Sequence, residues 1–379
     1  MDKFEIVITT LFGLEALAAR EVRRLGYETA SVEDGRVTFY GDWEAVCRAN
    51  MWIRTGERVL IKTAEFEAVT FDELFERTKA VDWGHFIGKN DAFPVKGYSL
   101  KSTLASVRDC QAIIKKAVAD SLSTEYGISW LPEDGVTYQI QFSIFKDKVS
   151  LMIDTSGEGL HKRGYRQLSN VAPLKETLAA AMVELSHWKY EYPLCDPFCG
   201  SGTIPIEAAM IKRNIAPGIS REFAFNEFSQ VDNCLWDKVK DEAKSLERDV
   251  PLEIYAYDID SDTVELAKNN AVKAGVGEFV VPKRGDARKI NFDMPYGTII
   301  CNPPYGERIG EIKECEKLYK DLGVNFKKLD KWSYYIITSN ENFEKLFGKK
   351  ANKKRKLYNG MIKCNLYQFF GERPPKVEK

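Results

Sequence analysis

The octapeptide from Asp196 to Thr203 reads DPFCGSGT and lies between an apolar strand pattern and a helical pattern. Its glycines, Gly200 and Gly202, let the backbone approach a ligand closely, and the start of a helix offers unpaired N–H groups. The segment lacks the GK[ST] ending of a phosphate-binding P-loop and the GxGxxG spacing of a dinucleotide fold. A lone GxG also suits a tight strand-to-helix turn, so this loop indicates a ligand site only together with other residues.

Acidic residues follow the next two predicted strands. Asp258 ends the strand pattern 252–257 and can accept hydrogen bonds from a ribose diol. It also lies near the N-cap of the following helix, a role that Asp260 or Ser261 fits better. Asp286, in the tetrapeptide RGDA, can bind an adenine amine or can simply close a turn.

The pentapeptide NPPYG, from Asn302 to Gly306, ends a further strand. Its prolines make the corner rigid. The Asn302 amide oxygen and the adjacent backbone carbonyl can both accept from an exocyclic amine, which orients the nitrogen lone pair, and Tyr305 can stack on a planar base. No general base is required, because the amine can lose its proton after attack. Read alone, NPPY is more often a strand-ending turn, but its place on the same predicted sheet edge as the glycine loop favours a catalytic role.

The elements that must position these motifs fall into two halves. Up to residue 156, strands and helices mix in the order expected of an α+β domain, with a long helix predicted at 107–126. From residue 172, helices and strands alternate, which predicts a doubly wound, mostly parallel α/β sheet that ends in an antiparallel hairpin. Ligands of such sheets lie at the carboxyl ends of the strands, where all the motifs above are expected to meet.

DPFCGSGT followed by NPPYG resembles the S-adenosylmethionine-dependent amino-methyltransferases, which have the class I (Rossmann-like) methyltransferase fold and methylate exocyclic amines of bases. Four further segments resemble parts of the THUMP-linked members of this family. They are GLHKRGYR at 159–166, APLKETLAA at 172–180, IAPG at 215–218 and KLYNG at 356–360.

This resemblance implies a ferredoxin-like region at 1–60, a THUMP RNA-binding domain at 61–156 and a methyltransferase domain at 157–379. It also implies that S-adenosylmethionine is bound and that S-adenosylhomocysteine is the product. The residues expected to line the cofactor site are Pro173, Leu174, Asp196, Phe198, Cys199, Gly200, Ser201, Gly202, Thr203, Asp258, Asp286 and Ala287. Among them, Asp258 would hold the ribose and Asp286 the adenine. The residues expected to hold the target base are Asn302, Pro303, Pro304 and Tyr305.

The charge of the chain is close to balanced, with 55 Lys and Arg against 56 Asp and Glu, which excludes a uniformly basic nucleic-acid coat protein. It is unevenly spread, because the last 40 residues carry a net +7 and the first 339 a net −8. Two basic clusters are candidates for RNA contact, although each also fits a solvated loop or a charged linker. They are Lys162, Arg163 and Arg166 beside His161, and Lys353, Lys354, Arg355 and Lys356 beside Lys349 and Lys350.

The eight cysteines form no CxxC pair and there are only three histidines, so no metal site is expected. No base accompanies Cys199, which argues against a nucleophilic thiol. Reduced thiols, the lack of an apolar run of about 20 residues and the lack of a signal-peptide layout predict a cytoplasmic protein.

The leading hypothesis is methyl transfer from S-adenosylmethionine to the exocyclic N2 of a guanine in structured RNA, and the resemblance favours 23S ribosomal RNA. The alternatives are a tRNA guanine-N2 methyltransferase, a DNA adenine-N6 methyltransferase and a catalytically silent RNA-binding assembly factor. The sequence indicates no oligomeric state.

Overall fold

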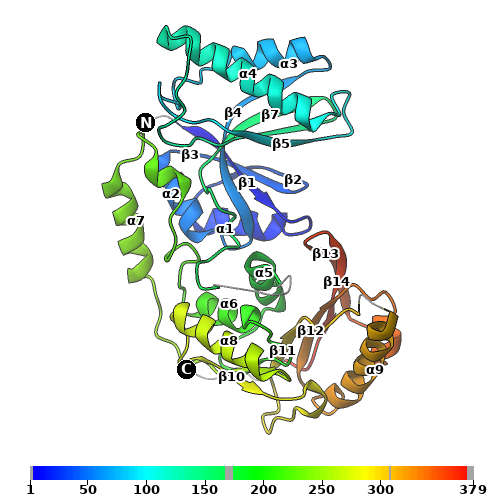
Figure 1. The fold of residues 1–379 in the computed structure, drawn as a ribbon. Helices are drawn as coiled ribbons and strands as arrows, with labels where there is room; N and C mark the ends of the chain where they lie inside the picture. Colours follow the sequence, from blue (N-terminus) through cyan, green and yellow to red (C-terminus); the bar gives the residue numbers. More distant parts are fainter. Residues whose placement is uncertain (1–2, 167–173, 307–308, 374–379) are drawn as a thin grey trace.

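The computed structural model describes residues 3–166, 174–306 and 309–373, and the chain forms two seven-stranded sheets (Figure 1). The first sheet has the strand order β2-β3-β1-β4-β7-β6-β5. Its strands are β1 (Phe4–Thr10), β2 (Thr29–Glu33), β3 (Arg36–Gly41), β4 (Gly56–Glu67), β5 (Val95–Leu100), β6 (Ile140–Phe145) and β7 (Lys148–Asp154). Neighbouring strands are antiparallel except β5 and β6, which run parallel.

Four helices accompany this sheet, and their ends follow from local chemistry. They are α1 (Glu15–Arg24), α2 (Trp43–Trp52), α3 (Phe71–Lys79) and α4 (Val107–Tyr126). The Thr70 side chain caps α3, and Ser106 caps α4 by accepting from the Asp109 N–H. Helix α4 ends at Gly127, whose φ of 63° is the left-handed conformation that favours glycine.

Strand β4 joins the two N-terminal regions into one sheet. It is 12 residues long, pairs with β1 through its first half and with β7 through its second half. The boundary expected between residues 60 and 61 therefore lies inside a strand. The ferredoxin-like and THUMP regions share this sheet and one apolar core.

The second sheet has the order β10-β9-β8-β11-β12-β14-β13. Its strands are β8 (Leu194–Asp196), β9 (Ile254–Asp258), β10 (Val280–Arg284), β11 (Thr298–Cys301), β12 (Ser333–Thr338), β13 (Lys353–Asn359) and β14 (Ile362–Phe369). The five strands from β10 to β12 are parallel, and β14 and β13 add antiparallel, which confirms the expected Rossmann-like sheet with a terminal hairpin. The chain order reverses between β8 and β11, where ligands of such sheets bind.

The helices of this half lie mostly where the sequence predicts them. They are α5 (Glu176–Ser186), α6 (Thr203–Lys212), α7 (Asn233–Ser245), α8 (Ser261–Lys273), α9 (Ile309–Phe326) and α10 (Phe343–Phe347), with short 3₁₀ turns η1 (Ala224–Glu227) and η2 (Ala287–Lys289). Strand β2 and helix α7 are additional to the expected elements, and α9 begins at Ile309 rather than at Cys315. Across the described part of the chain, no helix combines the length and apolar character needed to cross a membrane.

The segment between α6 and β9 returns to the N-terminal core, although it lies within the range expected for the methyltransferase domain. Phe223, Phe225 and Phe228 are buried in the same apolar cluster as the strands of the first sheet, together with Trp236 of α7. Helix α7 runs beside α2 (Figure 1). The second half of the chain therefore holds the first half through this inserted segment as well as through the direct connection.

A glutamate of the N-terminal half holds the start of α5. Glu57 of β4 accepts hydrogen bonds from Lys175 Nζ and from Thr177 Oγ1, both at 2.6 Å, and His161 Nδ1 lies 3.6 Å from the same carboxylate. Burial alone would raise the pKa of Glu57, but these contacts outweigh it and lower the pKa to about 2. The ionised carboxylate therefore stabilises the junction between the two halves.

Glu57→Gln is expected to destabilise the protein at neutral pH. The folded pKa of about 2 lies below the ordinary value of 4.5, so the contribution of the carboxylate is complete above that value and disappears as the pH falls toward 2. A shift of this size corresponds to at most about 3 kcal/mol of unfolding free energy. Urea unfolding between pH 7 and pH 2 should show the two proteins converging at the acid end. A stability difference independent of pH would contradict the prediction.

Candidate cofactor and substrate site

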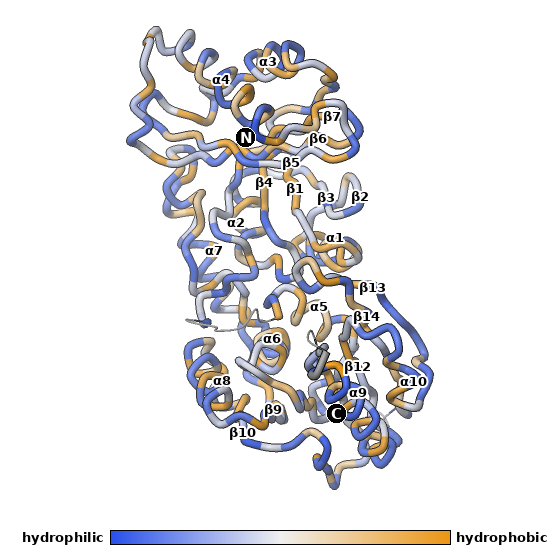
Figure 2. Tube along the Cα trace, turned by 45° about the vertical axis from the view of Figure 1, so that its right-hand side comes forward, coloured by the Kyte–Doolittle hydropathy of each residue, from blue (hydrophilic) through white to orange (hydrophobic). Residues whose placement is uncertain are grey.

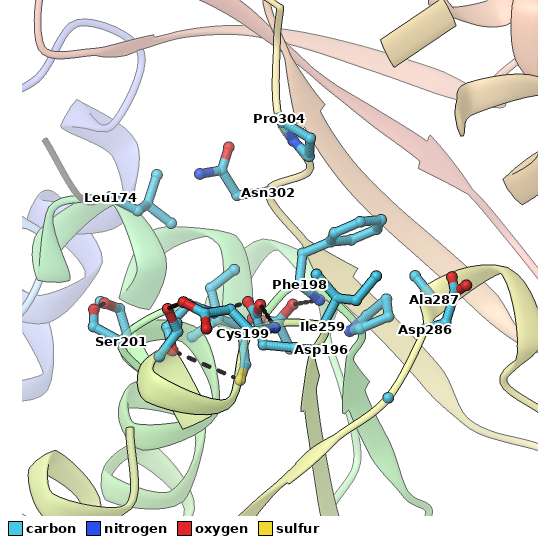
Figure 3. A pocket seen from close by; sticks show the side chains of 18 of the residues that line it. Leu174, Asp196, Phe198, Cys199, Ser201, Ile259, Asp286, Ala287, Asn302 and Pro304 are labelled. Atoms are coloured by element: carbon cyan, nitrogen blue, oxygen red, sulfur yellow. Dashed lines mark hydrogen bonds between the residues drawn. The ribbon is translucent and has the colours of Figure 1, made fainter. Parts of the chain in front are cut away.

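A cavity of about 940 Å³ lies at the carboxyl ends of β8, β9, β10 and β11 (Figure 3). It brings together the glycine loop, both acids and the NPPY corner. The expected site residues in its lining are Leu174, Asp196, Phe198, Cys199, Gly200, Ser201, Thr203, Asp258, Asp286, Ala287, Asn302 and Pro304. The lining does not include Gly202, Pro303 or Tyr305, and Pro173 lies outside the described residues.

Several lining residues are not among those expected from the sequence motifs. They are Pro197, Ile204, Ile259, Asp260, Asp262, Thr263, Leu266, Gly285, Arg288 and Leu318. All but Leu266 and Leu318 are within five positions of an expected site residue, so the sequence around Asp258 and Asp286 already indicated them. Leu318 comes from α9, and no motif marks it in the sequence.

Backbone hydrogen bonds shape the glycine loop. Oδ1 of Asp196, at the end of β8, accepts from the Phe198 N–H at 3.0 Å. The Cys199 N–H donates to the carbonyl of Tyr257 on the neighbouring strand β9 at 2.8 Å. The loop is therefore fixed to both strands before any ligand binds.

Two glycines give the loop its turn. Gly200 and Gly202 have φ values of 50° and 85°, in the left-handed region. Gly202 is also the N-cap of α6, and a Cβ placed on it would lie 3.2 Å from the Cβ of Ala267 on α8. Position 202 therefore requires glycine both for its backbone angle and for the close packing of α6 on α8.

The Asp258 carboxylate ties the glycine loop to β9. Its Oδ2 accepts from the Gly200 N–H at 3.0 Å and its Oδ1 accepts from the Asp260 N–H at 3.1 Å. The N-cap of α8 is Asp260, whose side chain accepts from the Asp262 N–H. Asp258 is thus free of the capping role and faces the cavity, where its remaining lone pairs can accept from hydroxyl groups.

Asp286 both closes a turn and lines the cavity. It caps the η2 turn, and Arg288 Nη2 donates to its Oδ2 at 2.7 Å. Hydrogen bonding from Arg288 holds the pKa of Asp286 below its usual range. This end of the cavity therefore presents an ionised carboxylate, which suits an amine donor.

At the inner end of the loop, the pKa of a carboxyl group is shifted in the opposite direction from that of Asp286. Asp196 is 1% exposed, and burial raises its pKa well above the usual range, an effect to which the nearby Asp258 adds. Burial also raises the pKa of the Cys199 thiol. The thiol therefore stays protonated at neutral pH, which fits a lining role and not a nucleophilic one.

At the NPPY corner, Asn302 is already engaged. The Tyr305 hydroxyl donates to Asn302 Oδ1 at 2.6 Å, and the Tyr305 side chain packs against the core of the second sheet, with Cys364 Sγ 3.6 Å from its hydroxyl. Burial raises the pKa of Tyr305 far above its usual range, so the phenol is a neutral donor. The Tyr319 hydroxyl donates to the Pro304 carbonyl at 2.7 Å and fixes the corner. The Tyr305 ring can stack on a base only if its hydroxyl releases Asn302 Oδ1, which would then need another donor.

The structure corrects the expectation that Arg163 contacts RNA. Arg163 is 3% exposed, and its Nε lies 3.4 Å from the fully buried carboxylate of Glu207 on α6. Its Nη2 donates to the Arg54 carbonyl at 2.5 Å. Its guanidinium is thus part of the protein interior. Lys162, its neighbour, is exposed and pairs with Glu158.

Arg166 likewise points inward, where the sequence analysis expected an RNA contact. It donates to the Leu174 carbonyl at 3.1 Å and to Thr203 Oγ1 at 2.7 Å. Both partners line the cavity. The charge pattern alone does not predict this outcome, because it does not show which acceptors the fold brings near an arginine.

The C-terminal basic run lies on β13, at the outer edge of the second sheet, where the trace in Figure 2 is mostly hydrophilic. Lys354 is ion-paired with a glutamate of α10, and Arg355 Nη1 donates to the Gly13 carbonyl of the N-terminal half at 3.1 Å. Lys353 and Lys356 are exposed. These two lysines are therefore the members of the run best placed for an external anion.

Three family models match successive parts of the chain. The RlmL ferredoxin-like domain matches residues 5–60, the THUMP domain matches residues 68–154, and the RMKL-like methyltransferase domain matches residues 163–368. The chain belongs to the THUMP-containing, RlmL-like family of RNA methyltransferases. Among the described residues of this methyltransferase, no group of three or more His, Cys, Asp or Glu side chains is placed to hold a metal ion.

Two relatives and one solved structure are similar to this methyltransferase over nearly its whole length. The protein named "Putative RNA methyltransferase YpsC" from Bacillus subtilis (strain 168) is 48% identical, with 100% of this chain and 99% of that one covered. Ribosomal RNA large subunit methyltransferase K/L from Pseudoalteromonas atlantica is 33% identical, and the match covers 97% of this chain and 53% of the relative. SMU.472, solved in complex with S-adenosylhomocysteine, has a TM-score of 0.93 at 42% identity, with 99% of this chain and 100% of that one covered.

The cofactor of this methyltransferase is S-adenosylmethionine, as the bound product in that related structure supports. The residues present fit such a group. The cavity combines the carboxylates of Asp258 and Asp286 with apolar surface from Phe198 and Leu266. Carboxylates suit the donors of an adenosine, and apolar surface suits its ring.

Gly202→Ala is expected to impair both stability and cofactor binding. A Cβ on left-handed backbone costs about 1–2 kcal/mol, and crowding against Ala267 adds to this. Gly26→Ala is a matched control, because Gly26 has a φ of 89° but a Cβ added there would meet no other atom within 4 Å. Urea unfolding should show a larger loss for the first variant, and calorimetric titration should show weaker S-adenosylhomocysteine binding in the first variant alone. Equal effects of both would contradict the packing argument.

Proposed function

We propose that this RNA methyltransferase transfers a methyl group from S-adenosylmethionine to the exocyclic N2 of a guanine in 23S ribosomal RNA. The observation that carries the proposal is that Asn302 and the glycine loop line one cavity. A methyl donor and an acceptor amine can therefore be held in the same space. Positioning of the two reactants supplies much of the rate acceleration in such a transfer.

In this proposal the acids at the strand ends hold the cofactor. Asp258 accepts from the ribose hydroxyls and Asp286 accepts from the adenine amine, while Phe198 provides apolar surface beside them. The bound cofactor supplies an electrophilic methyl group. The remaining chemistry falls to the residues of the NPPY corner.

Asn302 orients the target amine. Its Oδ1 accepts from the amine N–H, which directs the nitrogen lone pair toward the methyl group. An amide oxygen has two lone pairs, so the Tyr305 hydroxyl can share this oxygen or give way to the substrate. Pro303 and Pro304 restrict the backbone around it. The amine proton passes to solvent after attack, and no general base is assigned.

The RNA partner is supported by the N-terminal half. The THUMP model matches residues 68–154, and the K/L relative is named for the large-subunit ribosomal RNA. Binding in this cavity requires the guanine to leave its stack, which suits an unpaired or weakly paired position in structured RNA. The proposal places the enzyme in the cytoplasm, where ribosomal RNA is found.

Methyl transfer with labelled S-adenosylmethionine tests the proposal. Protein-free 23S ribosomal RNA, bulk tRNA and duplex DNA serve as substrates, and nucleoside analysis identifies the product. N2-methylguanosine in 23S ribosomal RNA is expected. The same nucleoside in tRNA alone would move the substrate to tRNA, and N6-methyladenine in DNA would overturn the guanine assignment. Tight RNA binding without any turnover would favour an assembly factor.

Asn302→Ala is expected to lower kcat by at least about a hundredfold, the size of effect seen when one preorganised hydrogen-bonding group is removed from an active site. Binding of S-adenosylhomocysteine and of RNA should remain close to that of the unmodified protein. Asn269→Ala, at an exposed position of α8, is the control and should retain full activity. Unchanged turnover in Asn302→Ala would remove the residue from the proposed mechanism.

Lys353→Gln combined with Lys356→Gln is expected to weaken RNA binding and to flatten its dependence on salt. Each lost phosphate contact lowers the slope of log K against log salt by about 0.7–0.9. Fluorescence anisotropy with ribosomal RNA fragments at several salt concentrations measures this slope. The control pair Lys268→Gln and Lys273→Gln makes the same change in net charge on α8. Equal slopes for both pairs would rule out a specific role for β13.

A further inference from the structure

Arg166 lies behind one end of the cofactor cavity and holds residues that line it. A single guanidinium nitrogen, Nη2, donates to Thr203 Oγ1 at 2.7 Å and to the Leu174 carbonyl at 3.1 Å. The same nitrogen lies 3.4 Å from Oε1 of Glu176, whose side chain is only 4% exposed. The Arg166 side chain is itself 14% exposed. Its cation is therefore turned toward the cavity wall and away from external phosphates.

The cavity has two distinguishable ends. Figure 3 shows Asp286 and Ala287 at one end and Leu174 and Ser201 at the other. If the adenine lies at Asp286 and the ribose at Asp258, the rest of the cofactor extends toward Leu174 and Ser201. That part of S-adenosylmethionine is an amino acid, with a carboxylate and an ammonium group.

The end near Ser201 suits a carboxylate. Thr203 is the first residue of α6, a ten-residue helix with no acidic residue in its first turn. The N-terminus of a helix carries a partial positive charge that favours an anion. The cation of Arg166 lies against that terminus, because it donates to the Thr203 hydroxyl. Two independent features therefore make the same end of the cavity attractive to negative charge.

We propose that Arg166 is a positioning residue for the amino-acid end of S-adenosylmethionine and acts through the Thr203 hydroxyl, an inference that rests on the proposed placement of the adenosine. A threonine hydroxyl has one proton and two lone pairs. Because Arg166 donates to one lone pair, the hydroxyl keeps its own proton for another acceptor. The nearest hydroxyl is Ser201 Oγ at 3.3 Å, a long contact. A carboxylate is a stronger acceptor for this proton.

The three contacts of Arg166 also explain why an arginine stands here. Its guanidinium is permanently charged, and its Nη2 holds Thr203 and the Leu174 carbonyl together. Glu176 offsets its charge on the protein side. Recognition of the cofactor tail is thus built into the segment that connects the two halves of the chain.

The test compares two ligands that share the adenosine. S-adenosylhomocysteine carries the amino-acid tail, whereas 5′-methylthioadenosine lacks its carboxylate and ammonium groups. Calorimetric titration of full-length Arg166→Met should show S-adenosylhomocysteine binding weakened by about tenfold or more, the usual effect of losing a hydrogen bond to a charged group. Binding of 5′-methylthioadenosine should change by less than about twofold.

Thr203→Val provides a second variant that leaves the Arg166–Glu176 pair in place. It should show the same selective loss, and Thr203→Ser, which keeps the hydroxyl, should restore binding. The double variant Arg166→Met with Thr203→Val should be no weaker than the worse single variant, because the two residues act in series. Arg288→Met, at the adenine end, is the control and should weaken both ligands alike.

Equal weakening of both ligands by Arg166→Met and by Thr203→Val would overturn the inference and leave Arg166 a purely structural residue. Additive losses in the double variant would also overturn it. Wild-type protein that binds neither ligand would remove the proposed adenosine placement and this inference with it. Selective loss with serine rescue supports it.

Discussion

A buried carboxylate, Glu207 on α6, is the constraint on which the relation between the two halves depends. Nε of Arg163 lies 3.4 Å from it and Nη1 of Arg54 lies 3.7 Å from it, while the Tyr165 hydroxyl donates to it at 3.3 Å. Removing the Glu207 carboxylate would leave two buried guanidinium groups without their counter-ion, and breaking a buried ion pair in this way costs about 3–5 kcal/mol. Because Arg54 belongs to the N-terminal half, α6 cannot shift relative to that half without breaking the cluster.

The same helix begins at the glycine loop, so the cluster also sets where this loop lies relative to the N-terminal half. Thr203, one helical turn before Glu207, faces the cavity. The segment after α6 then returns to the N-terminal core through Phe225 and Trp236. The middle of α6 and the segment that follows the helix are therefore both tied to the first half of the chain. This arrangement gives the glycine loop a fixed position relative to the N-terminal half.

What the sequence predicts well is what local chemistry determines. Helix α4 is predicted at 107–126 from its apolar spacing and is found there, where Ser106 caps its first turn and Gly127 ends it in the left-handed conformation. The glycine loop and the NPPY corner converge because parallel strands of one sheet end at the same edge. The burial of Arg163 could not be predicted in this way, because the sequence does not show whether an arginine faces water or pairs with a buried carboxylate such as Glu207. Helix α7 does carry a helical apolar spacing, but only the assembled fold shows that this spacing buries against the first sheet.

The hairpin of β13 and β14 links the basic surface to the NPPY corner. Leu357 of β13, which directly follows Lys356, pairs with Cys364 of β14. Cys364 in turn contacts the hydroxyl of Tyr305, whose proton occupies the Asn302 oxygen proposed to receive the target amine. Because an amide oxygen has two lone pairs, an amine that enters the corner can bind this oxygen while the buried Tyr305 hydroxyl keeps its acceptor, so neither group is left unpaired. The phosphate contact proposed for the outer strand and the base position proposed for the corner thus involve the same hairpin.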